Sequence, residues 1–406
     1  MTMAENKDKK VLNVPPLRFP EFSGEWDYST IGSEFDLYSG NTPSRLDKEQ
    51  FNGDVNWISS GELKEHYIYD SKEKITEEAA SYNNLRLLPI GTFVIAIYGL
   101  EAEGVRGTGS IIKKKSTISQ ACMAFSSKGA IINEFLYSWY KKHGNLIGLK
   151  YAQGTKQQNL SYDIISQFRI SYPSIKEQKK LEEFISLLDE RIATQNKIIE
   201  KLQSLIKGLI DDIITLKCGQ LVAFETLYSK AGEGGTPTTS NTEFYDNGSI
   251  PFIKIDDLSN KYLSANKDYI TELGLKKSSA WLIPTHSIIY SNGATIGAIS
   301  INKYPVCTKQ GILGIVPNTN IDVEFLYYFM QSSYFQKEVE RVVTEGTMKT
   351  AYLKDINHIK CPIPDLDRQK EISHFLSVLS LKEDVERQLL QKYQIQKQYL
   401  LRKMFI

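Results

Sequence analysis

Hydrophobic side chains recur at a spacing of seven residues between residues 176 and 217. Leucine and isoleucine alternate there in steps of four and three, and Gln195 interrupts the series. The seam consists of Leu181, Ile185, Leu188, Ile192, Gln195, Ile199, Leu202, Ile206, Leu209 and Ile213. A repeat of this length is typical of a coiled-coil helix, and about 40 helical residues span roughly 60 Å.

A second helical pattern, with a weaker seam, covers residues 367 to 406. Its hydrophobic positions are Leu376, Leu379, Leu390, Tyr393, Leu400 and Met404. Glu383 and Glu386 occupy the middle of the stripe, so we expect them to face a polar partner, either Gln195 or another subunit. Because neither helix is expected to be stable alone, the sequence favours an antiparallel pair. The alternative is a long helix packed onto a globular core, with Gln195 in the seam by accident.

The rest of the chain mixes short β-like runs with turn clusters. The apolar run from Phe93 to Tyr98 predicts a buried strand, and residues 133–143 predict a helix. Prolines argue against regular structure in an N-terminal arm, which we expect to pack against the second domain or the C-terminal helix. The predicted division is an arm at 1–25, mixed α/β domains at 26–175 and 218–366, and helices at 176–217 and 367–406.

The same signals follow one another in both halves of the chain, roughly 190 residues apart. Matching pairs are Gly40-Asn41-Thr42-Pro43 with Gly235-Thr236-Pro237, Glu134-Phe135-Leu136-Tyr137 with Glu324-Phe325-Leu326-Tyr327, and Gln178-Lys179 with Gln369-Lys370. The repeat predicts an α+β fold of two similar domains, related by an approximate two-fold axis and joined by the two helices. Such an arrangement suits a target that also has two halves.

Composition and charge narrow the class of protein. Hydrophobic residues make up 41% and charged residues 24% of the chain, as in a soluble globular protein. The four cysteines have no CxxC spacing and the first ten residues carry no apolar signal, so we expect reduced thiols and a cytoplasmic location. A net charge of +1 is low for a nucleic-acid binder, so DNA binding would need local positive charge or a partner.

Motifs of catalysis are missing from the sequence. We find no phosphate-binding GxxxxGK[ST] loop, no GxGxxG motif, no amino-methyltransferase tetrapeptide and no GxSxG elbow. The five histidines have no metal-binding spacing, and Glu62-Leu63-Lys64 resembles a nuclease triplet no more than chance allows. A binding protein is therefore favoured over an enzyme with a dispersed active site.

The repeated polar loops are the best candidates for binding DNA. They combine Lys, Arg, Gln, Asn and Thr side chains, which bond to base edges and phosphates, with glycines that permit close approach. The first half contributes Thr42, Ser44, Tyr98, Arg106, Thr108, Lys113, Lys114, Gly154, Thr155, Lys156, Gln157, Gln158 and Asn159. The second contributes Thr236, Thr238, Lys254, Asn292, Thr295, Lys309, Gly346, Thr347, Lys349, Thr350 and Tyr352. Ordinary exposed loops are the alternative interpretation.

This ordered set of signals resembles the specificity subunit of bacterial type I restriction–modification systems. The Gly-Thr-Pro openings, the Gly-Thr loops and the Gln-Lys entries into the helices all match, and so does the stretch from Pro15 to Trp26. The resemblance covers essentially the whole chain. It implies that each mixed domain reads one half of a split DNA site in the major groove, while the paired helices set the spacer.

The resemblance also implies partners. Two methyltransferase subunits would bring S-adenosylmethionine and methylate adenine at N6, and two restriction subunits would bring ATP and Mg²⁺. No cofactor or metal is then expected in this chain. Because the candidate loops differ between the halves, we expect an asymmetric site. The rival function is a scaffold that recruits proteins through two adaptor domains on a coiled coil and does not bind DNA.

Overall fold

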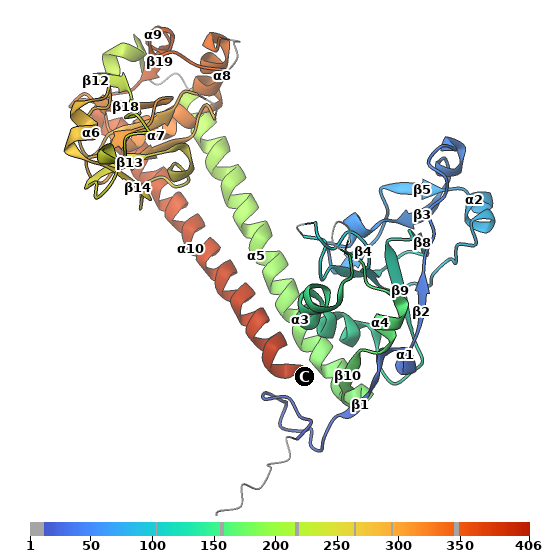
Figure 1. Ribbon diagram of the computed structural model, residues 1–406. Coiled ribbons are helices and arrows are strands. Elements are labelled where there is room, and N and C mark those ends of the chain that lie inside the picture. Colours follow the sequence, from blue (N-terminus) through green and yellow to red (C-terminus); the bar gives the residue numbers. More distant parts are fainter. Residues whose placement is uncertain are drawn as a thin grey trace, which may run out of the picture. The chain divides into compact units, whose positions relative to one another are not determined.

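The computed structural model describes residues 12–102, 104–154, 158–215, 219–263, 265–293, 295–344 and 349–406. The chain divides into two compact units (Figure 1). Unit 1 contains the residues up to Thr194 together with Leu389–Ile406, and unit 2 contains Gln195–Gln388. The predicted Thr155, Lys156, Gln157, Gly346 and Thr347 lie outside the described residues.

Unit 1 is built on a central mixed sheet with strand order β2-β9-β6-β7-β4, accompanied by the smaller sheets β5-β3-β8 and β1-β10. Its strands are β1 (Asp27–Thr30), β2 (Phe35–Ser39), β3 (Val55–Ile58), β4 (Tyr67–Ile68), β5 (Glu73–Ile75), β6 (Phe93–Ala96), β7 (Gly109–Ile112), β8 (Ser116–Ile118), β9 (Cys122–Ser127) and β10 (Arg169–Tyr172). Its helices are α1 (Ile31–Glu34), η1 (Lys48–Phe51), η2 (Ser60–Glu62), α2 (Glu77–Tyr82), α3 (Asn133–Tyr151) and α4 (Tyr162–Ser166). The predicted strand and helix are therefore confirmed as β6 and α3, although β6 ends at Ala96 and α3 extends beyond residue 143.

Unit 2 has the corresponding sheets β12-β18-β15-β16, β14-β13-β17 and β11-β19. Its strands are β11 (Gln220–Ala223), β12 (Tyr228–Glu233), β13 (Ile250–Ile253), β14 (Asp268–Ile270), β15 (Ile288–Ser291), β16 (Ile299–Ile301), β17 (Cys307–Thr308), β18 (Ile312–Pro317) and β19 (Lys360–Ile363). Its helices are η3 (Phe224–Leu227), η4 (Thr242–Phe244), η5 (Ile255–Asp257), α6 (Glu272–Lys276), α7 (Val323–Gln331), α8 (Ser333–Val342) and α9 (Leu353–Ile356).

Strand pairing is the same in the small sheets of the two units. In unit 1, β3 pairs antiparallel with β5 and parallel with β8. In unit 2, β13 pairs antiparallel with β14 and parallel with β17. The single helix α3 of unit 1 corresponds to α7 and α8 of unit 2, which are separated at Ser332. The Ser332 hydroxyl accepts a hydrogen bond from the Phe335 amide, so it caps α8 at the break.

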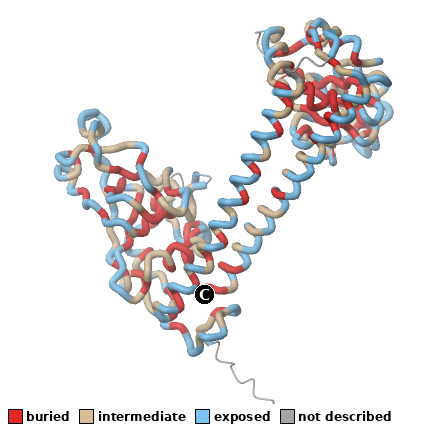
Figure 2. The backbone as a smooth tube through the Cα atoms, turned by 180° about the vertical axis from the view of Figure 1, so that it is seen from behind, coloured by how far each residue is buried: buried red, intermediate tan, exposed pale blue. Residues whose placement is uncertain are grey.

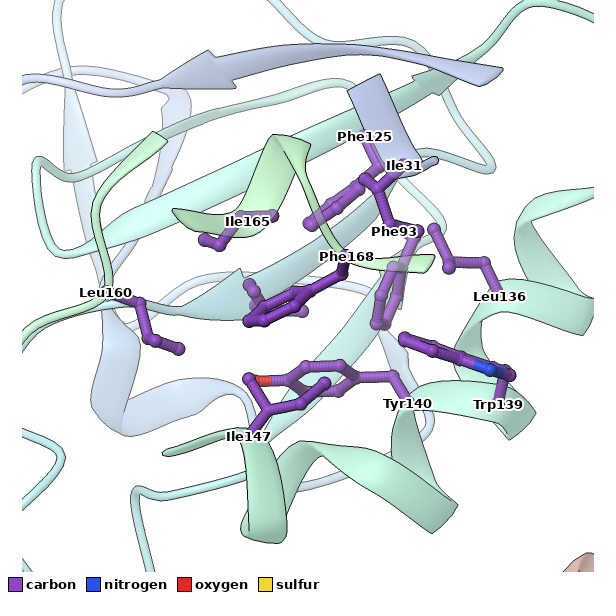
Figure 3. A pocket seen from close by; sticks show the side chains of 11 residues that line it. Ile31, Phe93, Phe125, Leu136, Trp139, Tyr140, Ile147, Leu160, Ile165 and Phe168 are labelled. Atoms are coloured by element: carbon purple, nitrogen blue, oxygen red, sulfur yellow. The ribbon is translucent and has the colours of Figure 1, made fainter. Parts of the chain in front are cut away.

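The core of unit 1 lies between the central sheet and α3. Side chains from β6, α3 and α4 surround Tyr140, whose hydroxyl is buried without a partner among the described residues (Figure 3). The space left among these apolar side chains is about 10 Å³, which is at the lower limit for one water molecule. This part of unit 1 is therefore packed interior and offers no ligand pocket.

The two long helices, α5 (Ile175–Thr215) and α10 (Leu366–Met404), each contribute to both units. In unit 1, Leu181 of α5 and Leu400 of α10 belong to the same hydrophobic cluster. In unit 2, Ile206 of α5 packs in one cluster with Leu376 of α10. The early part of each helix thus packs beside the late part of the other, which confirms the antiparallel pair. Figure 2 shows buried positions recurring along both helices, and every residue of the predicted seam whose burial is described is buried or half-buried.

Gln195 meets Glu386 in the seam, as expected. The Gln195 side-chain amide donates to the Glu386 carboxylate and, over 3.1 Å, to its backbone carbonyl. Only 5% of Gln195 and 8% of Glu386 are exposed. Hydrogen bonds from Lys382 and Gln195 lower the pKa of Glu386, so the carboxylate is charged at neutral pH. Glu383 differs, because it pairs with Arg387 of its own helix.

The N-terminal arm packs on unit 1, where it contacts both long helices. The Leu17 amide donates to the Lys403 carbonyl near the end of α10, over 3.0 Å. Arg18 binds Glu177 at the start of α5 with two hydrogen bonds of 2.7 Å. The Phe19 ring packs edge-on against Phe184. Of the two expected positions for the arm, the structure supports the C-terminal helix.

Candidate nucleic-acid interface

The candidate loops of unit 1 converge at one end of its central sheet, beside Ile97. The Ile97 amide donates to the Ala121 carbonyl over 2.9 Å, and the Ile97 carbonyl accepts from the Leu160 amide over 2.9 Å. These bonds bring the segments after β6, β8 and α3 together. We call the described residues of 40–44, 97–108, 119–121 and 153–160 the unit-1 rim.

Unit 2 repeats this junction with Asn292 in the place of Ile97. The Asn292 amide donates to the Gly311 carbonyl over 3.1 Å, and the Asn292 carbonyl accepts from the Ala351 amide over 2.9 Å. We call the described residues of 234–238, 292–297, 309–311 and 349–352 the unit-2 rim. The structure therefore brings repeated sequence segments to the same place in both units.

The Gly-Thr-Pro turns have a structural role at these rims. The Thr42 hydroxyl accepts a hydrogen bond from the Gln120 amide, and the Thr236 hydroxyl accepts one from the Gln310 amide. A Cβ atom on Gly40 would collide with the Ile118 carbonyl, and one on Gly234 would collide with the Thr308 carbonyl. Gly234, rather than Gly235, is thus the counterpart of Gly40.

Most of the remaining unit-1 candidates lie on the rim. The Arg106 guanidinium donates to the Gln158 side chain over 2.9 Å, and its alkyl chain packs against Gly148 of α3. The Arg106 Nε atom is buried without a partner among the described residues. Exposed or half-exposed positions on the same rim are Ser44, Tyr98, Thr108, Gly154 and Asn159.

Lys113 and Lys114 lie away from the unit-1 rim. Strand β7 begins near the rim, where Gly109 pairs with Ile95, and runs away from it, so that Ile111 pairs with Phe93. Lys113 and Lys114 follow the end of β7 that is distant from the rim. The Lys113 ammonium lies 4.0 Å from the centre of the Tyr67 ring, and Lys114 pairs with Asp70 over 3.4 Å. The structure therefore does not bring this basic run together with the other candidates.

The unit-2 candidates divide by exposure. Asn292 is 1% exposed and its side-chain amide donates to the Ala351 carbonyl, so it holds the rim together from inside. Lys254 is exposed beside the rim and pairs with Asp268 over 2.8 Å. Exposed or half-exposed positions on the rim are Thr236, Thr238, Thr295, Lys309, Lys349, Thr350 and Tyr352.

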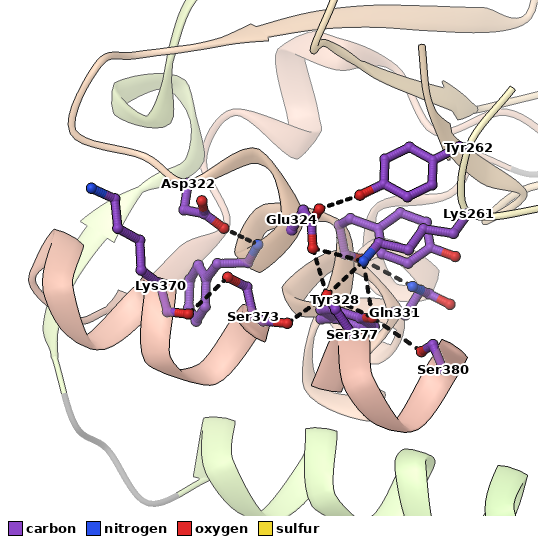
Figure 4. A network of polar contacts seen from close by, with 12 residues as sticks. Lys261, Tyr262, Asp322, Glu324, Tyr328, Gln331, Lys370, Ser373, Ser377 and Ser380 are labelled. Atoms are coloured by element: carbon purple, nitrogen blue, oxygen red, sulfur yellow. Dashed lines mark hydrogen bonds and ion pairs between the residues drawn. The ribbon is translucent and has the colours of Figure 1, made fainter. Parts of the chain in front are cut away.

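A polar network joins unit 2's mixed domain to α10. The Lys261 ammonium bonds to Glu324 at the start of α7 and to Ser377 of α10, over 2.8 Å and 2.7 Å (Figure 4). The Tyr262 hydroxyl also donates to the Glu324 carboxylate. Because these residues come from different elements, the network fixes how the mixed domain lies against α10 within unit 2.

Unit 1 carries a related network in which histidine replaces the lysine. His66 bonds to Glu134 at the start of α3 over 2.9 Å and lies 4.0 Å from Asp189 of α5. Its ring stacks between Tyr67 and Tyr137, with centroid distances of 4.0 and 3.8 Å. The sequence repeat indicated Glu134 and Glu324, but it did not indicate His66 and Lys261, because these residues differ.

The half-buried Glu182 side chain lies next to the unit-1 network. Burial, and then the charge of Glu134, raise the pKa of Glu182 to about 9. One Glu182 carboxyl oxygen is inaccessible and without a partner among the described residues, while the other accepts a hydrogen bond from Ser138. Burial, and then the charge of Lys397, lower the pKa of nearby Lys141 to about 8. These two shifts make unit 1 a place where we expect stability to depend on pH.

Two properties of the described residues bear on the class of protein. None of their His, Cys, Asp and Glu side chains gather in threes or more around a potential metal position. Among the helices formed by these residues, none combines the length and apolar character of a membrane span.

Comparison with known proteins identifies relatives along nearly the whole chain. The type I restriction enzyme MjaIX specificity subunit of Methanocaldococcus jannaschii is 26% identical over 364 residues, covering 84% of this chain and 83% of the relative. The EcoR124I/EcoR124II specificity subunit of Escherichia coli is 24% identical over 369 residues, covering 82% of this chain and 88% of the relative.

Solved structures share the fold at lower identity. The crystal structure of a type I restriction–modification S subunit from M. genitalium matches 97% of this chain and 99% of its own, with a TM-score of 0.57 and 17% identity. The model of the family described as type I restriction modification DNA specificity domain matches residues 23–204 and 228–393. The chain therefore belongs to the type I restriction–modification DNA specificity family, whose members are the non-catalytic DNA-recognition subunits of these systems.

Proposed function

We propose that this chain recognises a split, asymmetric DNA sequence and directs adenine-N6 methyltransferase and restriction subunits to it. The observation that carries the proposal is the pair of equivalent rims, one in each unit, each assembled by matching hydrogen bonds around Ile97 or Asn292. Two equivalent reading surfaces suit two half-sites on one DNA duplex.

Differences between the rims support an asymmetric site. Where the second rim presents the exposed Lys309, the first rim has Ser119, which is only 4% exposed. Hydrogen-bonding side chains read base edges, so rims that present different side chains favour different half-sites.

An exposed apolar stripe on α10 supports the docking of partner subunits. Phe375, Val378, Leu381 and Val385 follow one another at helical spacing, and between 50% and 64% of each residue is exposed. A stripe of this kind on a helix that already packs on α5 is typical of a surface that receives another helix. We assign it to the methyltransferase subunits.

Removing a heptad from each long helix is expected to shorten the spacer between the half-sites. Deleting Gln195–Lys201 with Glu386–Lys392 keeps the seven-residue register and removes the buried Gln195–Glu386 pair as a whole. The seam shortens by about 10 Å. Methylation sites mapped in cells give the spacer. An unchanged spacer with intact DNA binding would rule out the helices as the ruler.

Substituting one lysine in each half is expected to weaken DNA binding without affecting assembly. The variants are Lys156→Ala and Lys349→Ala, each of which removes one cation from a repeated polar loop. One phosphate contact fewer reduces affinity and lowers the salt slope by about one. Titration of the assembled complex at several salt concentrations measures both quantities. Unchanged affinity in both variants would remove these lysines from the interface.

A further inference from the structure

Each rim presents a glutamine at the same turn. Gln120 lies in the turn 119–121 between β8 and β9, and Gln310 lies in the turn 309–311 between β17 and β18. We call these segments the glutamine turns. The sequence repeat did not reveal them, because their neighbouring residues differ.

Matching hydrogen bonds hold the two glutamine turns. The residues that precede the glutamines, Ser119 and Lys309, each donate a backbone amide to the last residue of a parallel strand, over 2.9 and 3.0 Å. The Gln120 and Gln310 amides donate to the threonine hydroxyls of the Gly-Thr-Pro turns, over 3.5 and 3.3 Å. Gly40 and Gly234 each donate to the first residue of the strand that follows the turn.

These bonds make each turn a fixed support for the glutamine. No side chain larger than hydrogen fits at Gly40 or Gly234, because the adjoining Gly-Thr-Pro segment lies directly against the strand that leads into the turn. Such close packing keeps the backbone in one conformation, and a fixed backbone lowers the entropy lost when a side chain binds a target.

The glutamine side chains themselves are placed where they can contact a ligand. Gln120 and Gln310 are both exposed, and neither side-chain amide bonds to any residue that the structure describes. The residues beside them differ between the units, with Ser119 and Ala121 in unit 1 and Lys309 and Gly311 in unit 2. The glutamine is therefore a feature that both rims have in common on otherwise different surfaces.

We propose that Gln120 and Gln310 each read an adenine in the half-site bound by their own unit, by pairing with its major-groove edge. The inference rests on the proposed DNA-recognition function and names specificity-determining residues for it. A glutamine amide carries one donor and one acceptor, which match the N7 acceptor and N6 donor of adenine. It carries no charge, so it lacks the counterion-release gain that a lysine or arginine obtains from a phosphate contact.

The test measures binding of the complex with its methyltransferase partner to a panel of DNA duplexes. The wild-type site is first mapped by adenine methylation, and each base pair of each half-site is then changed in turn. The variants are Gln120→Leu and Gln310→Leu, which keep the side-chain size and remove the amide. Gln167→Leu is the matched control, because Gln167 is equally exposed at the end of α4 but lies outside the rim.

We expect Gln120→Leu to lose at least about tenfold in discrimination at one A·T pair of one half-site, and Gln310→Leu to do the same in the other half-site only. Gln120→Glu should move the preference at that pair toward cytosine, whose N4 amine donates to a carboxylate. Each variant thus serves as the control for the other half-site.

Other outcomes overturn the inference. Binding that is weakened equally for every DNA sequence would indicate a phosphate contact. Dissociation of the methyltransferase subunit from the complex would indicate a protein contact. Unchanged discrimination in both variants would show that the glutamines do not read bases. A different outcome would contradict the proposed function itself: a wild-type complex that binds no DNA sequence selectively.

Discussion

Replacing Arg18 with alanine is expected to destabilise unit 1 by about 3 kcal/mol, because it leaves a buried carboxylate without its counter-ion. Glu177 is 1% exposed, and Arg18 reaches both of its oxygens over 2.7 Å. Arg18 belongs to the N-terminal arm, while Glu177 lies in the first turn of α5. The arm therefore supplies a charge that the folded end of α5 requires.

Hydrogen exchange, measured at amides of both units, shows which unit loses stability in the variant. Amides of unit 1 should lose protection in Arg18→Ala, while amides of unit 2 serve as an internal control. The double variant Arg18→Ala/Glu177→Gln should recover much of the loss, because no buried charge remains. Equal loss in the single and double variants would contradict an electrostatic cause and assign the effect to packing of the arm.

Replacing Glu182 with glutamine is expected to stabilise unit 1 by about 3 kcal/mol at pH 7 and by more at pH 9. Burial raises the pKa of Glu182 to about 9, so the folded chain keeps a proton that the unfolded chain releases near pH 4.5. The folded state consequently loses stability as the pH rises from about 4.5 to 9. Glutamine is neutral throughout, still accepts from Ser138, and removes this loss.

Thermal unfolding measured between pH 5 and pH 9 tests whether the folded state loses stability as the pH rises. The wild-type and Glu182→Gln curves should nearly coincide at pH 5 and separate progressively toward pH 9. Glu183→Gln is the matched control, because Glu183 is the exposed neighbour on the same helix. A variant that is less stable than the wild type at pH 8 would show that the carboxylate is charged and favourable in the fold.

The long-range organisation of the chain was predictable from the sequence because it rests on periodicity. The seam of α5 follows a seven-residue spacing, and the strand β6 is a continuous apolar run. Gln195 was one of the two partners expected for Glu386, and the structure shows this pair. These features are local or repetitive, so they can be recognised without knowing the fold.

Contacts between segments that lie far apart in the sequence were harder to predict. His66 meets Glu134 and Asp189 only after β4, α3 and α5 have packed together, and nothing near His66 in the sequence indicates this. The raised pKa of Glu182 has the same origin, because Glu134 and Ser138, which lie against it, come from α3.

The candidate rim was predicted in part. Thr42 and Thr236 were singled out as DNA contacts, but their hydroxyls bond to the glutamine turns. The sequence repeat does not single out Gln120 and Gln310, because the residues on either side of each glutamine differ. Aligning Gly40 with Gly234 would have suggested a common structural frame for the two turns.

Genome-wide mapping of adenine methylation shows whether this chain selects the DNA sequence that is methylated. Cells would express the methyltransferase subunit with this chain, without it, or with the paired heptad deletion. We expect a single split, asymmetric motif that requires this chain and whose spacer shortens in the deletion variant. A stable complex that produces no chain-dependent motif would contradict it and favour a scaffold that does not read DNA.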